Sequence, residues 1–351
     1  MRTFTFKGLF LTVVFMLLGC LSIQAADDDL ITKQITIKLD KAGTLTGKIG
    51  SSKMYKITNL KIIGKINGTD LRMIREMAGN NYNGDSTKGN LSVLDLSEAR
   101  IVEGGNDYFY RNGICYTSND VIGSYAFYGC SRLTSINLPA SITSIGHDAF
   151  TGCCGLTSLN LPAGITEIGY SVFFGCSGLT SLNLPAGITQ IDNYVFLGCS
   201  GLTSISLPAS ITKIGEQAFL GCSGLTSISL PASITKIGED AFRNCSGLKS
   251  IYVYAEKVPE ILSDAFKGCD AKKCTVYVPK GTYDDYWLSD FGYFFENIVE
   301  FDATGIDKTT TSTDVEEVSR YSVNGQRLVG PTKGLNIVKY SDGSVKKVAV
   351  E

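Results

Sequence analysis

A block of sequence that opens with Ile122-Gly-Ser-Tyr-Ala-Phe-Tyr-Gly-Cys130 and continues to Ser144 decides the fold, because it recurs along the chain. The block restarts, 23 residues later each time, at Ile145, Ile168, Ile191, Ile214 and Ile237. A degenerate copy follows, in which Ala265, Phe266 and Cys269 come one residue late. Nearly every position of the period is reproduced, so the sequence predicts one structural unit stacked on copies of itself.

One copy of the repeat predicts a short strand followed by a return segment. In Leu202-Thr-Ser-Ile-Ser-Leu207 apolar and polar side chains alternate, which is typical of a strand with one buried face. Pro208 ends the strand because it has no N–H to give to a neighbouring strand. On the return wall, Phe219 is expected to be buried in a short helical turn. The backbone is then expected to turn sharply at Gly221 and Gly224.

Stacking is required because a single coil has no partner for its apolar side. Equivalent strands are expected to pair in parallel, about 4.8 Å apart. The spacing of Leu, Ile and Cys is the leucine-rich-repeat pattern. The sequence therefore predicts a leucine-rich-repeat solenoid, with a parallel β-sheet on one face and short helical turns on the other.

The repeat also resembles one particular family. The phrase "IG..AF.GCSGLTSI.LPASIT.IG", over about residues 122–270, resembles the BspA-like leucine-rich-repeat surface proteins of Bacteroidota. Leu91-Ser-Val-Leu-Asp-Leu96 resembles the entry coil of that family, and Val278-Pro-Lys-Gly-Thr-Tyr283 its exit cap. The resemblance implies a cell-surface or extracellular protein that attaches to matrix proteins or to other cells.

The flanking segments are expected to cap the solenoid, since open ends are exposed sheet edges. We predict an N-terminal cap over 26–90, with an amphipathic helix over 69–79, and leucine-rich repeats over 91–275. A C-terminal cap is predicted over 276–303. Bulky aromatic side chains there are expected to cover the last coil, with sugar binding as the alternative: Tyr286, Trp287, Phe291, Tyr293, Phe294 and Phe295.

Beyond the cap, residues 304–314 predict a threonine-rich linker and 315–351 a small β unit. Asn324-Gly325 and Asp342-Gly343 are hairpin turn signals between alternating strands. This stretch resembles the C-terminal sorting domains of secreted Bacteroidota proteins, and the alternative is a passive β tail.

The first 25 residues predict a secretory signal peptide. Arg2 and Lys7 precede an apolar run over 8–18, and small residues end near Ala25. Leu17-Leu-Gly-Cys20 resembles a lipoprotein box, so the alternative is lipidation of Cys20, which alone would give membrane contact. The protein is expected at the cell surface or outside the cell, with an outer-membrane lipoprotein or a periplasmic protein as the alternatives.

Residues that carry chemistry are few. The net charge of −2 and the lack of a basic run argue against nucleic acid as a partner. His147 is the single histidine, so no His-based metal site or catalytic pair is available, and we expect no enzyme and no cofactor. The recurrent cysteines, Cys130 to Cys245, are expected to form a reduced, packed ladder. If a disulfide forms, Cys269 with Cys274 is the pair expected.

Two faces of the solenoid are candidates for binding. The strand face is a uniform Thr/Ser surface, either solubilising or adhesive. The return wall varies from coil to coil. Along it, Phe174, Leu197 and Leu220, beside Tyr170 and Tyr194, form either an exposed apolar stripe that could bind a partner or a stripe that is partly covered. The partner expected is a surface or matrix protein of a host or microbe. A glycan is the alternative partner, and the strand-side candidates for it are Tyr252 and Tyr254.

Overall fold

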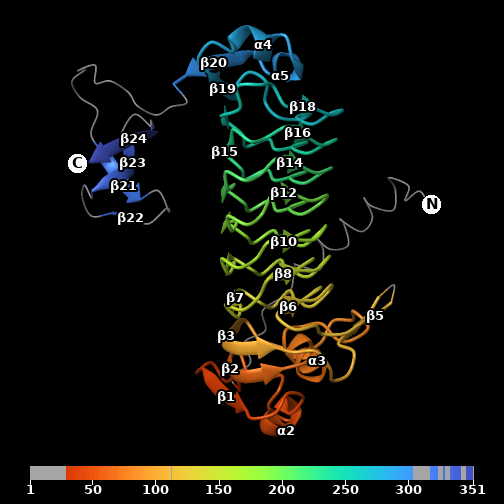
Figure 1. Ribbon diagram of the computed structural model, residues 1–351. Helices are drawn as coiled ribbons and strands as arrows, with labels where there is room; N and C mark the ends of the chain where they lie inside the picture. Colours follow the sequence, from red (N-terminus) through yellow and green to blue (C-terminus); the bar gives the residue numbers. More distant parts are fainter. Residues whose placement is uncertain are drawn as a thin grey trace.

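The computed structural model describes residues 29–111, 113–302, 317–322, 327–328, 333–340 and 345–350. Figure 1 shows stacked coils between two end caps, which confirms the predicted solenoid. The predicted signal peptide, residues 1–25, and the predicted linker, 304–314, lie outside the described residues.

One wall of the solenoid is a series of parallel strands, one strand from each coil. Its regular members are β7 (Ser135–Asn137), β9 (Ser158–Asn160), β11 (Ser181–Asn183), β13 (Ser204–Ser206), β15 (Ser227–Leu230) and β17 (Ser250–Val253). Pairing is in register at a separation of one repeat, as in Ile136 opposite Leu159. The central residue of each strand is buried and the residues beside it face outward, as the alternation predicts.

A second wall, which the sequence analysis did not anticipate, consists of two-residue strands that also pair in parallel. They are β6 (Val121–Ile122), β8 (Ser144–Ile145), β10 (Glu167–Ile168), β12 (Gln190–Ile191), β14 (Lys213–Ile214), β16 (Lys236–Ile237) and β18 (Glu260–Ile261). Each strand is short because a buried Ile is followed by a bend, which is at a glycine in most coils. The coil therefore has three sides.

The third side, here called the turn wall, comprises residues 124–131 and their equivalents in each later coil. It contains turns and no helix within the described coils, so the predicted helical turns do not become helical segments. The turns bond between coils instead: the N–H groups of Phe127 and Gly129 donate to Ala149 and Thr151 of the next coil. This pattern satisfies backbone groups that an isolated turn would leave to solvent.

The interior is built from two ladders of identical side chains. Phenylalanine rings stack from coil to coil with centroids 5.0–5.7 Å apart and interplanar angles of 2–15°. They are Phe127, Phe150, Phe173, Phe196, Phe219, Phe242 and Phe266. Beside them run the recurrent cysteines, Cys130 to Cys245, which are free thiols, as the sequence predicts. Cys269 and Cys274 are also free, so the disulfide suggested for that pair is absent.

Each ladder thiol from Cys153 to Cys245 has a polar partner. The Sγ of Cys153 donates to the carbonyl of Phe127, and that of Cys222 to the carbonyl of Phe196, both over 3.1 Å. The acceptor always lies in the preceding coil, so the thiol links two coils while it packs as a small apolar group. A Cys–Cys bridge would remove this link, which is a physical reason for the reduced ladder.

Two glycines of the repeat turn out to serve different purposes. Gly221 has φ +74°, a left-handed conformation that favours glycine, as expected for a sharp turn. Gly224 does not need a special φ, so the prediction was wrong about its role. A Cβ at Gly224 would lie 2.5 Å from the carbonyl oxygen of Ser200 in the preceding coil. Glycine is required there because two backbones approach closely.

The N-terminal cap extends the strand wall with longer strands. β1 (Ile35–Leu39), β2 (Asn59–Ile66) and β3 (Val93–Ile101) pair in parallel and continue into β7. α2 (Leu45–Ile49) and α3 (Gly68–Met77) lie beside them, and Asn67 with Asp70 forms a capping box for α3. A small hairpin projects from the solenoid next to α3 (Figure 1), made of β4 (Phe109–Tyr110) and β5 (Ile114–Cys115).

The C-terminal cap closes the other end. β19 (Thr275–Pro279) and β20 (Asn297–Phe301) extend the strand wall, and α4 (Tyr283–Trp287) and α5 (Asp290–Phe294) lie between them in sequence. Phe291 and Phe295 pack on Phe266, the last ring of the ladder. Farther along, β21 (Glu317–Ser322), β22 (Arg327–Leu328), β23 (Gly334–Tyr340) and β24 (Val345–Val350) form an antiparallel sheet.

Candidate interaction surface

The turn wall is the part of each coil where the repeat varies most. Three positions of this wall differ from coil to coil, while the Phe, Cys and Leu of the core stay constant. The first position holds His147, Tyr170, Asn193, Glu216 and Glu239. The second holds Asp148, Ser171, Tyr194, Gln217 and Asp240, and the third Thr151, Phe174, Leu197, Leu220 and Arg243. The scaffold is thus repeated, and the surface over it is individual to each coil.

The second position has a left-handed backbone in every coil although none of its residues is glycine. Its φ values lie between 52° and 64°, for example 64° at Tyr194 and 52° at Gln217. A left-handed conformation costs an ordinary residue about 1–2 kcal/mol. Every coil has this unfavourable conformation. The side chains at this position make contacts that glycine could not make; for example, the Tyr194 hydroxyl donates a hydrogen bond to Oε1 of Glu216 over 2.8 Å.

The apolar stripe predicted on this wall is largely covered. Leu197 is buried, with 3% of its surface exposed, and Phe174 and Leu220 are half-buried. Backbone bonds from Gly175 to Leu197 and from Gly198 to Leu220, both 2.8 Å, hold neighbouring turns together. Side chains of this column therefore pack on one another. Leu197 offers no surface to a partner, so the stripe is not a continuous exposed patch.

The two predicted tyrosines on the wall are more accessible. Tyr170 is 42% exposed, and its ring lies on the His147 ring with centroids 3.7 Å apart and an angle of 14°. The backbone N–H of Tyr170 also donates to Nδ1 of His147 over 3.1 Å. Tyr194 is half-buried, and burial with the neighbouring Glu216 raises the pKa of its phenol to about 12. Both hydroxyls therefore stay protonated at neutral pH.

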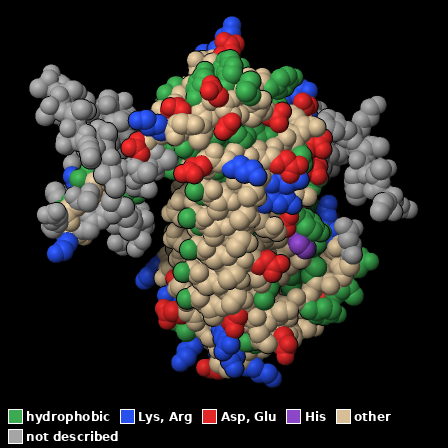
Figure 2. All heavy atoms as spheres, turned by 45° about the horizontal axis from the view of Figure 1, so that its top comes forward, with side chains coloured by type: hydrophobic (Ala, Val, Ile, Leu, Met, Phe, Trp, Pro, Cys, Tyr) green, Lys and Arg blue, Asp and Glu red, His purple; other side chains and the backbone are tan. Residues whose placement is uncertain are grey.

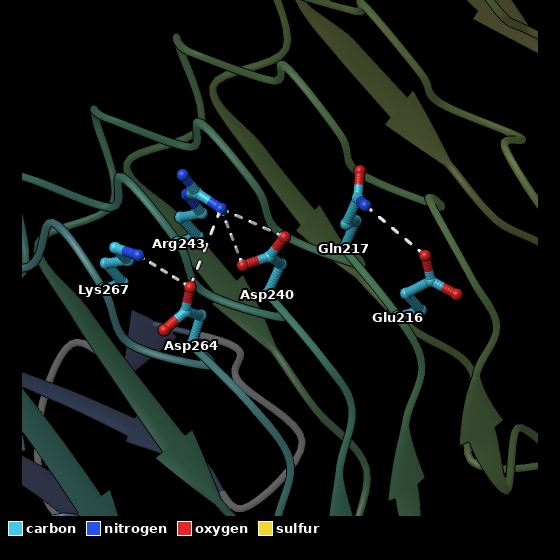
Figure 3. Close-up of polar contacts among 6 residues, drawn as sticks. All are labelled: Glu216, Gln217, Asp240, Arg243, Asp264 and Lys267. Atoms are coloured by element: carbon cyan, nitrogen blue, oxygen red, sulfur yellow. Dashed lines mark hydrogen bonds and ion pairs between the residues drawn. The ribbon is translucent and has the colours of Figure 1, made fainter. Parts of the chain in front are cut away.

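The end of the turn wall nearest the C-terminal cap is charged. Figure 3 shows Asp240, Arg243, Asp264 and Lys267 in an alternating row across two coils. Arg243 Nη1 lies 3.2 Å from Asp240 Oδ1 and 4.0 Å from Asp264 Oδ2, while Lys267 Nζ lies 2.8 Å from the same Asp264 oxygen. The wall thus changes from aromatic near the N-terminal cap to charged near the C-terminal cap.

The strand-side tyrosines that were candidates for sugar binding, Tyr252 and Tyr254, are in contact with other aromatic rings. Tyr252 stacks on Tyr277 at 4.5 Å and 9°, and the edge of Phe301 meets both Tyr252 and Tyr254. Tyr252 and Tyr254 are each half-buried. A sugar ring needs an open aromatic face, and this arrangement covers one face of Tyr252.

The remaining strand face is polar and nearly without charge. Thr157, Thr180 and Thr203 each donate to the threonine carbonyl of the preceding coil, over 3.0–3.2 Å. Their hydroxyl protons are therefore used inside the protein. Figure 2 shows how little charge lies over the middle of the coils compared with the ends of the solenoid.

Sequence reasoning missed two exposed apolar groups at the ends. On the N-terminal hairpin, Tyr110, Ile114 and Tyr116 are between 54% and 57% exposed. In the C-terminal cap, Tyr286, Phe291 and Phe295 are buried as predicted, whereas Trp287 and Tyr293 are exposed. Aromatic and acidic residues lie close together over 283–296, and the sequence analysis took the aromatic residues as cover for the last coil, with sugar binding as the alternative.

Among the described residues, no group of three or more His, Cys, Asp or Glu side chains is placed to hold a metal ion. In the same part of the chain, no helix has the length and apolar character needed to cross a membrane.

The fold and its outward surface define a leucine-rich-repeat solenoid. A family model described as BspA type leucine rich repeat region matches six copies in this chain, over residues 120–249 and 166–284. A search of curated proteins gave no match.

Several solved structures are similar. A leucine-rich repeat protein from Bacteroides ovatus is 21% identical, with 80% of this chain and 71% of that chain covered and a TM-score of 0.40. A leucine rich cell surface protein from Faecalibacterium prausnitzii is 22% identical, with 80% and 74% covered and a TM-score of 0.42.

Proposed function

We propose that the chain is exported and binds a surface or matrix protein of a host or microbe, through the turn wall and without catalysis. The observation that carries the proposal is the contrast between a constant core and a turn wall that differs in each coil. Side chains that only had to hold coils together would repeat with the core. Repeat proteins in general bind along extended surfaces of this kind.

The lack of a reaction centre supports a binding role. Within the described coils, the interior is filled by the phenylalanine and cysteine ladders, which leave no set of polar groups converging from different coils. Burial raises the pKa of the ladder thiols, well above the ordinary value for Cys153, Cys176 and Cys199. A thiol that stays protonated is a poor nucleophile, so these buried thiols are unsuited to nucleophilic catalysis.

The proposed location is the cell surface or the extracellular space. The apolar segment over 8–18 and the small residues before Ala25 support export, and lipidation at Cys20 would keep the protein on a membrane. Protease treatment of intact cells distinguishes these sites from the periplasm, since only surface-exposed protein is cleaved.

The binding proposal is tested by presenting the full chain to arrays of purified matrix proteins and of glycans. A turn-wall variant, Tyr170→Ala with Glu239→Ala, is compared with a strand-face variant, Asn160→Ala with Asn183→Ala. All four side chains are exposed, so both variants are expected to fold. We expect the turn-wall variant to lose at least about tenfold in affinity for a protein ligand, since interface anchors are worth about 1–2 kcal/mol or more.

Two results would reverse the proposal. Loss of binding only in the strand-face variant would move the site to the Thr/Ser wall. Binding to glycans with no protein ligand would favour a glycan-binding component of an uptake system.

A further inference from the structure

The C-terminal cap carries an exposed apolar patch that its capping role does not require. Tyr283 is 39% exposed, Trp287 45%, Leu288 84% and Tyr293 81%. The residues that cover the last coil are different ones: Tyr286, Phe291 and Phe295 are buried against it. Large apolar side chains that stand together in water without packing inward mark an interaction surface.

The aromatic rings of this cap patch are arranged so that some of their faces are open to solvent. Tyr283 and Trp287 lie one turn apart on α4 with ring planes 8° apart and centroids 6.0 Å apart. Tyr293 follows on α5, where its ring meets only the edge of Phe294 among the described rings. The outer faces of tryptophan and tyrosine carry negative charge density, which attracts cations.

The segment that carries the patch is acidic, and the exposed lysines Lys272, Lys273 and Lys280 lie in the chain before it. Within 283–300 five carboxylates are exposed, and the segment contains no Lys or Arg: Asp284, Asp285, Asp290, Glu296 and Glu300. None of the five makes an ion pair with a described basic side chain, while Glu300 accepts backbone hydrogen bonds from Gly281 and Tyr283. Figure 2, which turns this end toward the viewer, shows acidic, basic and apolar side chains interspersed there.

The geometry points to a docking site for a cationic segment of a protein partner, rich in Arg or Lys, on the face of α4 and α5. Arginine side chains would lie on the open rings while their charge is balanced by the surrounding carboxylates, so one residue type satisfies both features. An anionic partner would be repelled, and a second copy would bring five more carboxylates against these five. This inference rests on the proposed binding function and adds a partner class and a second surface.

Trp287 makes a direct test available because it is the only tryptophan of the chain. The full chain is titrated with deca-arginine, and with deca-glutamate as the opposite charge, while tryptophan emission is recorded. We expect deca-arginine to change the emission in a saturable way and deca-glutamate to have no effect. The affinity should fall as salt is raised, because the carboxylates contribute to binding.

Charge-matched variants separate a local site from general attraction. The cap variant Asp284→Asn/Asp285→Asn/Asp290→Asn and the control variant Asp40→Asn/Glu103→Gln/Glu167→Gln each remove three exposed carboxylates. We expect the cap variant to weaken deca-arginine binding at least about tenfold, and the control to stay within about twofold. Tyr293→Ala should weaken binding while Tyr293→Phe retains it, since a phenyl ring keeps the aromatic face.

Equal losses in the two charge variants, or unchanged affinity in Tyr293→Ala, would overturn the inference. So would a concentration-dependent dimer in sedimentation that Tyr293→Ala abolishes, since the occupant would then be a second copy. If deca-arginine does not bind at the cap while a protein ligand still binds through the turn wall, only the cap site is rejected. Conversely, a turn-wall variant that keeps its affinity for the protein ligand would reject the turn-wall site, while deca-arginine binding at the cap could still be observed. The two proposals can therefore fail separately.

Discussion

Arg75 of α3 donates a hydrogen bond from Nη2 to the carbonyl of Tyr128, in the first regular coil, over 3.2 Å. In later coils the equivalent carbonyl accepts from the backbone of the coil before it, as Thr151 accepts from Gly129. In the same way, Nη1 of Arg75 donates a hydrogen bond to the carbonyl of Ala126, and the Tyr108 hydroxyl donates one to the carbonyl of Ser124. The cap therefore replaces a missing coil with side-chain donors at the same three positions.

Arg75→Met should destabilise the N-terminal end of the solenoid. Arg75 is fully buried, so methionine would leave the carbonyls of Ala126 and Tyr128 without donors, at about 1–3 kcal/mol each. We expect a loss of about 2–5 kcal/mol in urea unfolding, and faster amide exchange over 122–130 than over 214–222.

Arg72→Met on the same helix is the matched control. Arg72 is half-buried and lies over the Tyr82 ring at 4.1 Å, so its loss should cost less than about 1 kcal/mol. Similar losses for Arg72 and Arg75 would show that the carbonyl contacts do not stabilise the end.

Gly224→Ala should destabilise the protein more than Gly221→Ala. At Gly221 the added methyl group has ordinary space, 3.9 Å from the nearest Cα, and the cost is the left-handed backbone alone, about 1–2 kcal/mol. At Gly224 the methyl would lie 2.5 Å from a backbone oxygen, so adjacent coils must move apart. Thermal unfolding of the two variants measures the difference.

Asn244 is the natural control for this pair. It occupies the position of Gly221 one coil later, with φ 60°, because asparagine tolerates that conformation better than other residues. Gly221→Asn should therefore cost less than Gly221→Ala. The reverse order would indicate that space, and not backbone conformation, limits that position.

The coil and its core could be predicted because they depend on positions close together in sequence. Phe219, Leu202 and Ile205 are buried as their spacing predicts, and β13 ends before Pro208. Because the repeat is nearly exact, the burial pattern and strand position in one coil predict those of the next.

Features that depend on contacts between distant residues were not predictable. Arg75 meets its carbonyl partners about 50 residues away, and nothing in the pattern of α3 shows that the first coil lies there. The sequence left open whether Leu197 is exposed, and the structure shows that it is buried. The left-handed backbone of the turn wall was missed because tyrosine and glutamine do not favour it.

The buried cysteines should make the protein less stable at alkaline pH. Burial raises the pKa of Cys222 well above the ordinary value of 9.0, whereas the unfolded chain titrates near that value. The stabilisation is complete below pH 9 and is lost as pH rises from there toward the folded pKa, because only the unfolded chain releases the proton. Between pH 8 and 10 each such thiol should cost about 1.4 kcal/mol.

Cys222→Ala isolates this term from other alkaline titrations. The variant should be less stable than the natural chain at pH 8, because a buried sulfur and its bond to Phe196 are lost. That difference should shrink by about 1.4 kcal/mol at pH 10. Urea unfolding at both pH values measures it, and a difference that does not change with pH would rule out a buried, protonated thiol.

The row of charges on the turn wall should contribute little to stability and be sensitive to salt. Arg243 replaces the Leu220 of the preceding coil, and its side chain is 27% exposed, against 8% for that of Asp240. Exposed ion pairs are worth about 0–1 kcal/mol. In a double-mutant cycle, Arg243→Leu with Asp240→Asn should therefore show a coupling of about 0.5–1 kcal/mol, reduced in 1 M salt, where the screening length is about 3 Å.

The control is a second double-mutant cycle, Lys267→Leu with Asp264→Asn. These residues have the same spacing in sequence as the Arg243 pair, but both side chains are about half exposed. Its coupling should be smaller than that of the Arg243 pair because water screens it more. Equal couplings, or a coupling near Asp240 that salt does not alter, would mean that Arg243 acts by packing on its neighbours. In that case Arg243→Leu alone should be neutral, because leucine already packs at the same position of the preceding coil.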